Sequence, residues 1–229
     1  MRSDACARLA DYDLLGLGSP VHGFNVPRLV ARFLAGLPRS EGQRVFLFVT
    51  AMGGIGGALD RARRVLTREG YAVVHEARYY TGADYYLSHK VRLMTEEQIE
   101  KQFAWCAVDA HEAVAEILDG SECRVRAGGA MRVFSYLLGR AYLLGCKRGS
   151  TYWRVDDRCD ACGMCARACP AGNIRLVEGR PVFGSECTMC LRCLSICPQQ
   201  AIQYGSLFKK MGRYLAPGYT AVIAPDEAS

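Results

Sequence analysis

Short apolar runs alternate with amphipathic stretches through the first half of the chain. Residues 44–50 form a continuous β-branched and aromatic run, which predicts a central strand of a parallel sheet that is covered on both faces. Residues 11–20 predict another strand, which glycine and proline end in a turn, and residues 71–75 predict a third. We therefore expect three strands in the first part of the chain.

Helices are expected between these strands. Asn25 can cap a helix that has Pro27 in its first turn and stops before Pro38, and residues 58–68 predict the next helix. The order strand, helix, strand, helix, strand predicts right-handed parallel crossovers. The fold class expected for this part of the chain is therefore α/β.

Two further apolar stretches follow the third strand. Residues 95–98 (Thr-Glu-Glu-Gln) form a capping box that opens a long helix, which ends at Gly120 and is expected to pack on the sheet. Residues 131–146 are apolar but contain Arg132 and Arg140, so they cannot span a bilayer. They are predicted to pack against the α/β layer, with an interfacial helix as the alternative.

Composition and charge narrow the class of protein. Half of the 229 residues are hydrophobic and 23% are charged, as in globular proteins with a real core. The net charge of +6 lies mainly in residues 121–154, which hold seven basic residues against Glu122 alone. Because no nucleic-acid motif accompanies these charges, a solvated face or an acidic protein partner is favoured over nucleic acid.

The twelve cysteines indicate metal binding or thiol chemistry. The amino terminus lacks the apolar stretch of a signal peptide, and no membrane span is found, so we expect a cytoplasmic protein in which disulfides are rare. Four cysteines are scattered through apolar surroundings and are predicted to be structural. They are Cys6, Cys106, Cys123 and Cys146.

The other eight cysteines form an internal repeat. The first motif is Cys159-x2-Cys162-x2-Cys165-x3-Cys169-Pro170, and the second, 28 residues later, is Cys187-x2-Cys190-x2-Cys193-x3-Cys197-Pro198. Flanking apolar positions also correspond, Val155 with Phe183 and Ile174 with Ile202. The repeat predicts two equivalent half-modules that pack around two metal centres.

The spacing within each motif predicts crossed ligation. Three thiolates two residues apart can bind three irons of one cubane, while the fourth cysteine, after a longer step, faces the other cluster. A zinc ribbon is the alternative, but it needs four ligands per metal and no crossing. One predicted ligand set is Cys159, Cys162, Cys165 and Cys197, and the other is Cys187, Cys190, Cys193 and Cys169.

These motifs resemble those of bacterial two-cluster ferredoxins, in which two [4Fe-4S] clusters carry single electrons at low potential. Residues 13–23, together with residues 45–50 and the glycines after them, resemble the second half of a flavodoxin-like domain. The whole chain is thus similar to a flavodoxin–ferredoxin fusion protein. The resemblance implies that the matching loops contact the ring of FMN, through Ser19, Pro20, His22, Thr50, Gly53 and Gly54.

The chain departs from a flavodoxin at one point. A flavodoxin has five strands and a phosphate-binding loop after its first strand, whereas only three strands and no such loop are predicted here. We therefore expect weak FMN binding or none, and an exposed sheet edge that favours dimerisation. The alternative interpretation of residues 53–57 is a tight strand-to-helix turn. The alternative for His22 is a histidine in a surface loop.

The expected organisation is a partial flavodoxin-like domain over residues 1–150, a small α+β two-cluster ferredoxin domain over 151–206, and a tail over 207–229. The expected function is electron transfer through two [4Fe-4S] clusters, to or from FMN or a redox protein partner. The alternative is a flavin-dependent reductase or a redox-complex subunit fed by the clusters, although no acid–base constellation for an enzyme stands out.

Overall fold

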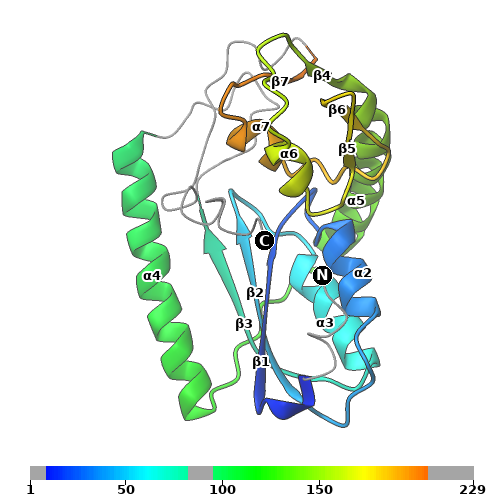
Figure 1. The fold of residues 1–229 in the computed structure, drawn as a ribbon. Helices are drawn as coiled ribbons and strands as arrows, with labels where there is room; N and C mark the ends of the chain where they lie inside the picture. The colour runs from blue at the N-terminus through cyan, green and yellow to red at the C-terminus, as the bar shows by residue number, and fades with distance from the viewer. Residues whose placement is uncertain (1–8, 82–94, 206–229) are drawn as a thin grey trace. The chain divides into compact units, whose positions relative to one another are not determined.

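The computed structural model describes residues 9–81 and 95–205 (Figure 1). The chain divides into two compact units, one of residues 1–82 and 94–142 and the other of residues 83–93 and 143–229. Cys6 and the tail predicted over residues 207–229 lie outside the described residues.

A three-stranded parallel sheet organises the first unit, after a 3-10 turn at Leu9–Asp11. Its strands are β1 (Leu14–Pro20), β2 (Arg44–Ala51) and β3 (Ala72–Tyr80), in the order β1-β2-β3 (Figure 1). The α/β fold class and the central position of β2 are thus confirmed. β3 continues past His75 because its charged second half still pairs with β2 up to Tyr80.

Helices α2 (Arg28–Ala35) and α3 (Ala58–Arg68) connect the strands and cover one face of the sheet. Their leucines and alanines form the core with one side of β2, where Val45, Leu47 and Val49 are at most 2% exposed. The predicted cap of α2 is wrong. The helix begins after Pro27 without a side-chain cap, and Asn25 instead donates through Nδ2 to the carbonyl oxygen of Ser135, at 2.9 Å.

The opposite face of the sheet is only partly covered, contrary to the prediction for β2. Phe46 and Phe48 are half-buried there, and their rings stack with centroids 6.2 Å apart. Each ring lies over a glycine of β1, because a Cβ at Gly16 or Gly18 would come within 2.4 Å or 2.2 Å of the ring of its neighbour. Aromatic residues beside strand glycines help to fix the register of a sheet. Here the two rings also cover part of the face opposite α2 and α3.

The predicted capping box opens α4 (Glu96–Asp119), which runs alongside β3 (Figure 1). Thr95 and Gln98 exchange hydrogen bonds of 3.3 Å and 2.9 Å, and Gly120 ends the helix in a left-handed conformation. Among the described side chains of α4, however, only Ala113 is buried, while Leu118 is 81% exposed. The expected packing of this helix on the sheet is therefore limited to a narrow contact.

Helix α5 (Gly129–Gly149) also packs differently from the prediction. Its large apolar residues Val133 and Leu137 are about 60% exposed, whereas Ser135 is buried. Gly139 lets the helix come close to the loop after β1, since a Cβ there would lie 2.4 Å from Nδ2 of Asn25. None of the described helices is both long and apolar enough to cross a membrane.

The second unit contains two short antiparallel strand pairs. After a 3-10 turn at Ser150–Tyr152, β4 (Trp153–Val155) pairs with β7 (Ile202–Tyr204), and β5 (Ile174–Val177) pairs with β6 (Arg180–Phe183). The short helices are α6 (Met164–Arg167) and α7 (Arg192–Ile196). A shift of 28 residues carries β4 onto β6, β5 onto β7 and α6 onto α7, so the sequence repeat is also a structural repeat.

Pairing within the strands supports this symmetry. Val155 lies opposite Ile202, and Phe183, which corresponds to Val155 in the repeat, lies opposite Ile174. Backbone conformation repeats as well, because three pairs of positions 28 residues apart all have φ between 49° and 72°. These pairs are Ala161 and Met189, Gly163 and Leu191, and Gly172 and Gln200.

Candidate metal centres

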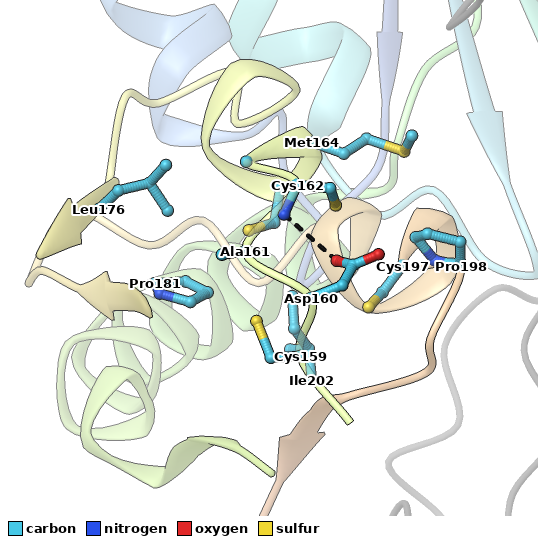
Figure 2. Close-up of a pocket in the computed structure, with 12 residues that line it drawn as sticks. Cys159, Asp160, Ala161, Cys162, Met164, Leu176, Pro181, Cys197, Pro198 and Ile202 are labelled. Carbon is cyan, nitrogen blue, oxygen red and sulfur yellow. Dashed lines mark hydrogen bonds between the residues drawn. The ribbon is translucent and has the colours of Figure 1, made fainter. Parts of the chain in front are cut away.

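Two pockets in the second unit collect the eight motif cysteines. The first is formed by the loop before α6 and by the start of the segment after α7, with Pro181 and Ile202 on its walls (Figure 2). Its cysteines are Cys159, Cys162, Cys165 and Cys197. The second pocket is lined by Trp153 and Phe183, and its cysteines are Cys169, Cys187, Cys190 and Cys193. Each pocket thus joins three cysteines of one motif with the fourth of the other.

Backbone N–H groups point at the sulfur atoms in both halves. Asn173 N lies 3.3 Å from Cys169 Sγ, and Ala201 N, 28 residues further on, lies 3.3 Å from Cys197 Sγ. Left-handed residues among right-handed ones turn successive amides to one side, which makes concave sites for anions. The repeated backbone conformation therefore favours thiolates or other anionic sulfur in both pockets.

Burial opposes free thiolates in the second pocket. Desolvation raises the pKa of Cys187 and Cys190, and desolvation together with neighbouring thiols raises the pKa of Cys193 well above its ordinary value. Metal ligation requires the thiolate form. A multiply charged metal centre would supply the positive charge that four clustered thiolates lack, so the donor set fits an iron–sulfur cluster.

Two buried hydrogen-bond donors in the second pocket also fit an iron–sulfur cluster. Trp153 Nε1 and Asn173 Nδ2 have no well-aligned hydrogen-bond partner among the described residues, although both residues line this pocket. The indole N–H of Trp153 works against the burial that raises the pKa of Cys187. Anionic sulfur is the acceptor that these two donors would need.

The two aromatic residues before the first motif differ in burial. Trp153 is 5% exposed and stacks on Phe183 at a centroid distance of 5.2 Å. Tyr152 lies in the 3-10 turn before β4 and is 55% exposed, so it contributes little to this core.

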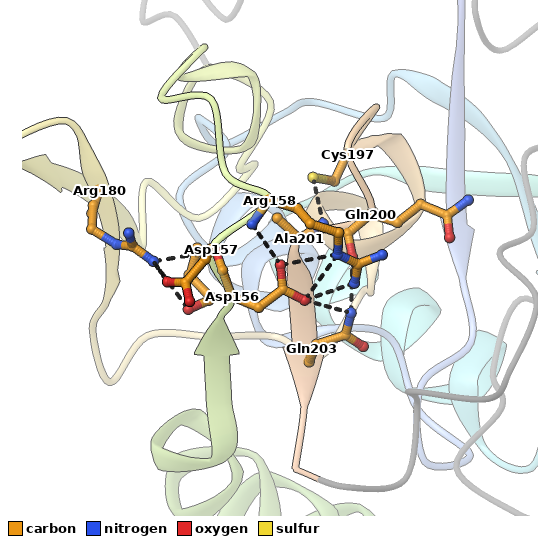
Figure 3. A network of polar contacts seen from close by, with 9 residues as sticks. Asp156, Asp157, Arg158, Arg180, Cys197, Gln200, Ala201 and Gln203 are labelled. Atoms are coloured by element: carbon orange, nitrogen blue, oxygen red, sulfur yellow. Dashed lines mark hydrogen bonds and ion pairs between the residues drawn. The ribbon is translucent and has the colours of Figure 1, made fainter.

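A network of hydrogen bonds beside the first pocket connects the two halves of the repeat (Figure 3). Arg158 donates to both carboxylate oxygens of Asp156 and, at 2.9 Å, to the carbonyl oxygen of Gln200. The hydrogen bond from Arg158 lowers the pKa of Asp156 to about 2. Gln203 donates to the same Gln200 oxygen at 2.8 Å, so the start of the first half is fastened to the end of the second.

The residues suggested for FMN lie around the carboxyl edge of the sheet. Pro20 and Thr50 are paired at the ends of β1 and β2, and Val21 N donates to the Thr50 carbonyl oxygen at 2.9 Å. Ser19 is buried, with its hydroxyl bonded to the Pro20 carbonyl oxygen, and His22 forms a turn with Asn25. Gly53 and Gly54 follow β2. Open α/β sheets bind ligands at this edge.

The turn from β2 into α3 has its first amides occupied. Gly57 N donates to Ser135 Oγ at 3.1 Å, and Ala58 N donates to the Ile55 carbonyl oxygen at 3.2 Å. A phosphate at a helix amino terminus needs such N–H groups free. These bonds favour a tight strand-to-helix turn over a phosphate cradle. Sequence reasoning missed Ser135, because no motif marks its contact with a turn 78 positions earlier.

Comparison with known proteins places the second unit in context. Residues 151–206 match the family model of the 4Fe-4S dicluster domain. A stretch of 46 residues is 46% identical to one subunit of the ion-translocating oxidoreductase complex of Methanosarcina acetivorans. That match covers 20% of the chain and 17% of the relative, so the chain spans only a small part of the relative's length. Both findings support iron–sulfur electron transfer as the chemistry of this domain.

Proposed function

We propose that the chain passes single low-potential electrons through two [4Fe-4S] clusters that are ligated in crossed sets. The observation that carries this proposal is the composition of the two pockets, each with three cysteines of one motif and the fourth of the other. One cluster is held by Cys159, Cys162, Cys165 and Cys197, and the other by Cys187, Cys190, Cys193 and Cys169.

The chain provides the environment in which these centres work. When bound, a [4Fe-4S] cluster accepts and releases one electron at a time. Amides such as Asn173 N and Ala201 N stabilise the negative charge on the sulfur atoms, and the apolar walls of the second pocket exclude water. Hydrogen bonds and solvent exposure are the protein's means of setting a cluster potential.

Metal analysis and two cysteine variants test the ligand sets. Anaerobically purified protein should contain about eight irons and eight sulfides per chain. Cys169→Ala should change the spectrum of the cluster bound by the second motif, and Cys197→Ala that of the cluster bound by the first. Cys146→Ala is the matched control, because this buried thiol belongs to neither pocket. Four irons, stoichiometric zinc, or loss of the cluster local to each substituted motif would contradict the proposal.

For the first unit, we propose a partial flavodoxin-like sheet that docks a redox partner. Support comes from the parallel order β1-β2-β3 and from loops that meet at its carboxyl edge. FMN contacts by Ser19, Pro20, His22, Thr50, Gly53 and Gly54 remain a prediction, and the occupied Gly57 amide argues for weak binding. A cytoplasmic location is proposed because the thiols must stay reduced to hold metal.

The second candidate is a subunit of a redox complex. It is favoured by the similarity to a protein named as a complex subunit, which lies within one fifth of the chain. Purification from native cells under anaerobic conditions, followed by sizing, distinguishes the two candidates. A subunit should elute with partner chains, whereas a carrier should elute alone or, if the edge of β1 pairs with a second copy, as a dimer. Turnover of a small-molecule acceptor by the isolated chain would instead indicate a flavin-dependent reductase.

A further inference from the structure

Three side chains of the first unit form a cluster that is separate from the cysteine motifs. His75 of β3, Glu116 of α4 and Cys123 each offer a ligand atom, and these atoms all lie within 4.8 Å of one another. His75 Nε2 is 2.8 Å from Glu116 Oε2. We propose that this cluster binds a single zinc ion.

The backbone fixes the three residues next to one another. Cys123 forms an isolated parallel bridge with His75, and its carbonyl oxygen accepts a hydrogen bond of 3.0 Å from Glu76 N. After Glu116, the left-handed Gly120 ends α4 and turns the chain back toward β3. The site is thus built on a strand, a helix and a segment tied to the strand edge, which keeps its geometry defined.

Two carboxylates, one of them fully buried, hold the segment after Cys123 in place. Glu76 is 1% exposed, forms an ion pair with Arg63 and accepts from Val125 N at 2.9 Å. Asp60, which also pairs with Arg63, accepts from Ala127 N at 3.0 Å. These bonds restrict the segment that carries Cys123, so its position beside His75 does not depend on a bound ion.

The donor types select zinc among common ions. Imidazole nitrogen, thiolate sulfur and carboxylate oxygen are the ligands that zinc takes in proteins, whereas magnesium and calcium prefer oxygen alone. With all three residues as ligands, one position is left for water, and with Glu116 hydrogen-bonded to the imidazole instead, His75 and Cys123 leave two. The cluster borders a cavity of about 430 Å³, also lined by Arg78, Asp109 and Arg126, so there is room for that water.

The buried imidazole supplies an independent indication. His75 is 1% exposed, and its Nδ1 has no hydrogen-bond partner among the described residues. An ion at Nδ1 would give this atom its partner while Nε2 donates to Glu116, as metal-bound histidines usually donate to a carboxylate. An ion at Nε2 would replace that hydrogen bond, with Glu116 as a ligand. Glu116 belongs to the site in both arrangements.

Protection of Cys123 from alkylation tests the proposal, with an internal control. Cleavage after Lys101 and Arg124 releases one peptide that contains both Cys106 and Cys123. Anaerobic holoprotein is treated with iodoacetamide with and without zinc, and each cysteine is quantified by fragmentation of that peptide. We expect zinc to slow alkylation of Cys123 by more than about tenfold and to leave Cys106 unchanged.

Variants of α4 show whether the protection comes from this site. Glu116→Gln should weaken zinc binding by at least the roughly 10- to 100-fold that loss of an outer carboxylate costs. Glu112→Gln is the matched control, because Glu112 lines the same cavity without belonging to the cluster. Both residues are exposed, so neither substitution should prevent folding.

X-ray absorption at the zinc edge distinguishes this site from zinc in the cysteine pockets. One sulfur neighbour among nitrogen and oxygen ligands is expected, with a zinc content of one per chain in addition to iron. Four sulfur neighbours would place the zinc in a cluster pocket and overturn the proposal. Equal alkylation of Cys123 with and without zinc would also overturn it, leaving a hydrogen-bonded histidine–carboxylate pair.

Discussion

Replacement of Trp153 by phenylalanine should lower the potential of one cluster and leave the other unchanged. The indole is buried, stacks on Phe183 and meets the edge of Tyr204 at a centroid distance of 5.0 Å. A phenylalanine keeps an aromatic ring at this position, although a smaller one, and removes the N–H that lowers the pKa of Cys187. Hydrogen bonds to sulfur raise a cluster potential because they favour the more negative, reduced form.

The size of the shift follows from the strength of the lost bond. A hydrogen bond to a charged group contributes about 1.5–3 kcal/mol, of which only the difference between the two redox states affects the potential. If that difference is about 1 kcal/mol, the shift is about 40 mV for one electron, since a tenfold change in equilibrium corresponds to about 59 mV. We therefore expect Trp153→Phe to move the second-pocket cluster about 40 mV lower.

An anaerobic redox titration followed by electron paramagnetic resonance measures the two potentials. Tyr152→Phe is the matched control, because this neighbouring aromatic residue is largely exposed and lines neither pocket. Iron content shows whether the variant keeps both clusters. If water entered around the smaller ring, the potential would rise, so the sign separates the two effects. An unchanged or higher potential in a fully loaded variant would refute the role assigned to the indole N–H.

Three other outcomes are expected. Gly172→Ala should destabilise the domain by about 1–2 kcal/mol in thermal unfolding, because Gly172 has a left-handed backbone with φ +58°. No atom lies near the Cβ position of Gly172, so the cost comes from the backbone alone. Gly53→Ala also points into open space but has no positive φ, so this control should be nearly neutral. Burial and the charge of Asp109 raise the pKa of Cys106, so Asp109→Asn should lower that pKa and speed alkylation of Cys106 near pH 8; an unchanged rate would contradict this. Titration with FMN, followed by flavin fluorescence, should show weak binding or none, because the Gly57 amide is occupied; tight binding would contradict that reasoning.

Features encoded locally were accessible from the sequence. The capping box of α4 needs only Thr95 and Gln98, three residues apart, and both of its hydrogen bonds are present. The β-branched run of β2 predicted its central place, because such runs are typical of strands with neighbours on both sides. The spacing within each cysteine motif likewise depends on a few neighbouring residues, and the repeat made the equivalence of the two halves visible.

Features that depend on distant contacts were not accessible. The partial cover over Phe46 and Phe48 depends on the glycines of β1, some thirty residues earlier in the chain. The apolar stretch of residues 131–146 predicted packing of α5 against the α/β layer, but it did not show that the buried Ser135 makes this contact by accepting a hydrogen bond from Gly57 N. His75 and Glu116 meet although they lie 41 positions apart, and neither stands in a motif.

The repeat also shows how two equivalent pockets can differ in function. The residue that corresponds to Trp153 after a shift of 28 positions is Pro181, and it lines the first pocket as Trp153 lines the second. Asn173 corresponds in the same way to Ala201, so the indole N–H of Trp153 and the side-chain amide of Asn173, which both lie at the second pocket, have no counterpart at the first. The thiols are matched, and so are the amides of Asn173 and Ala201, whereas these two side-chain donors are not. Hydrogen bonds to sulfur raise the potential of a cluster. We therefore expect these two donors to raise the potential of the second-pocket cluster and to make it the stronger electron acceptor. Trp153→Phe would remove one of the two contributions.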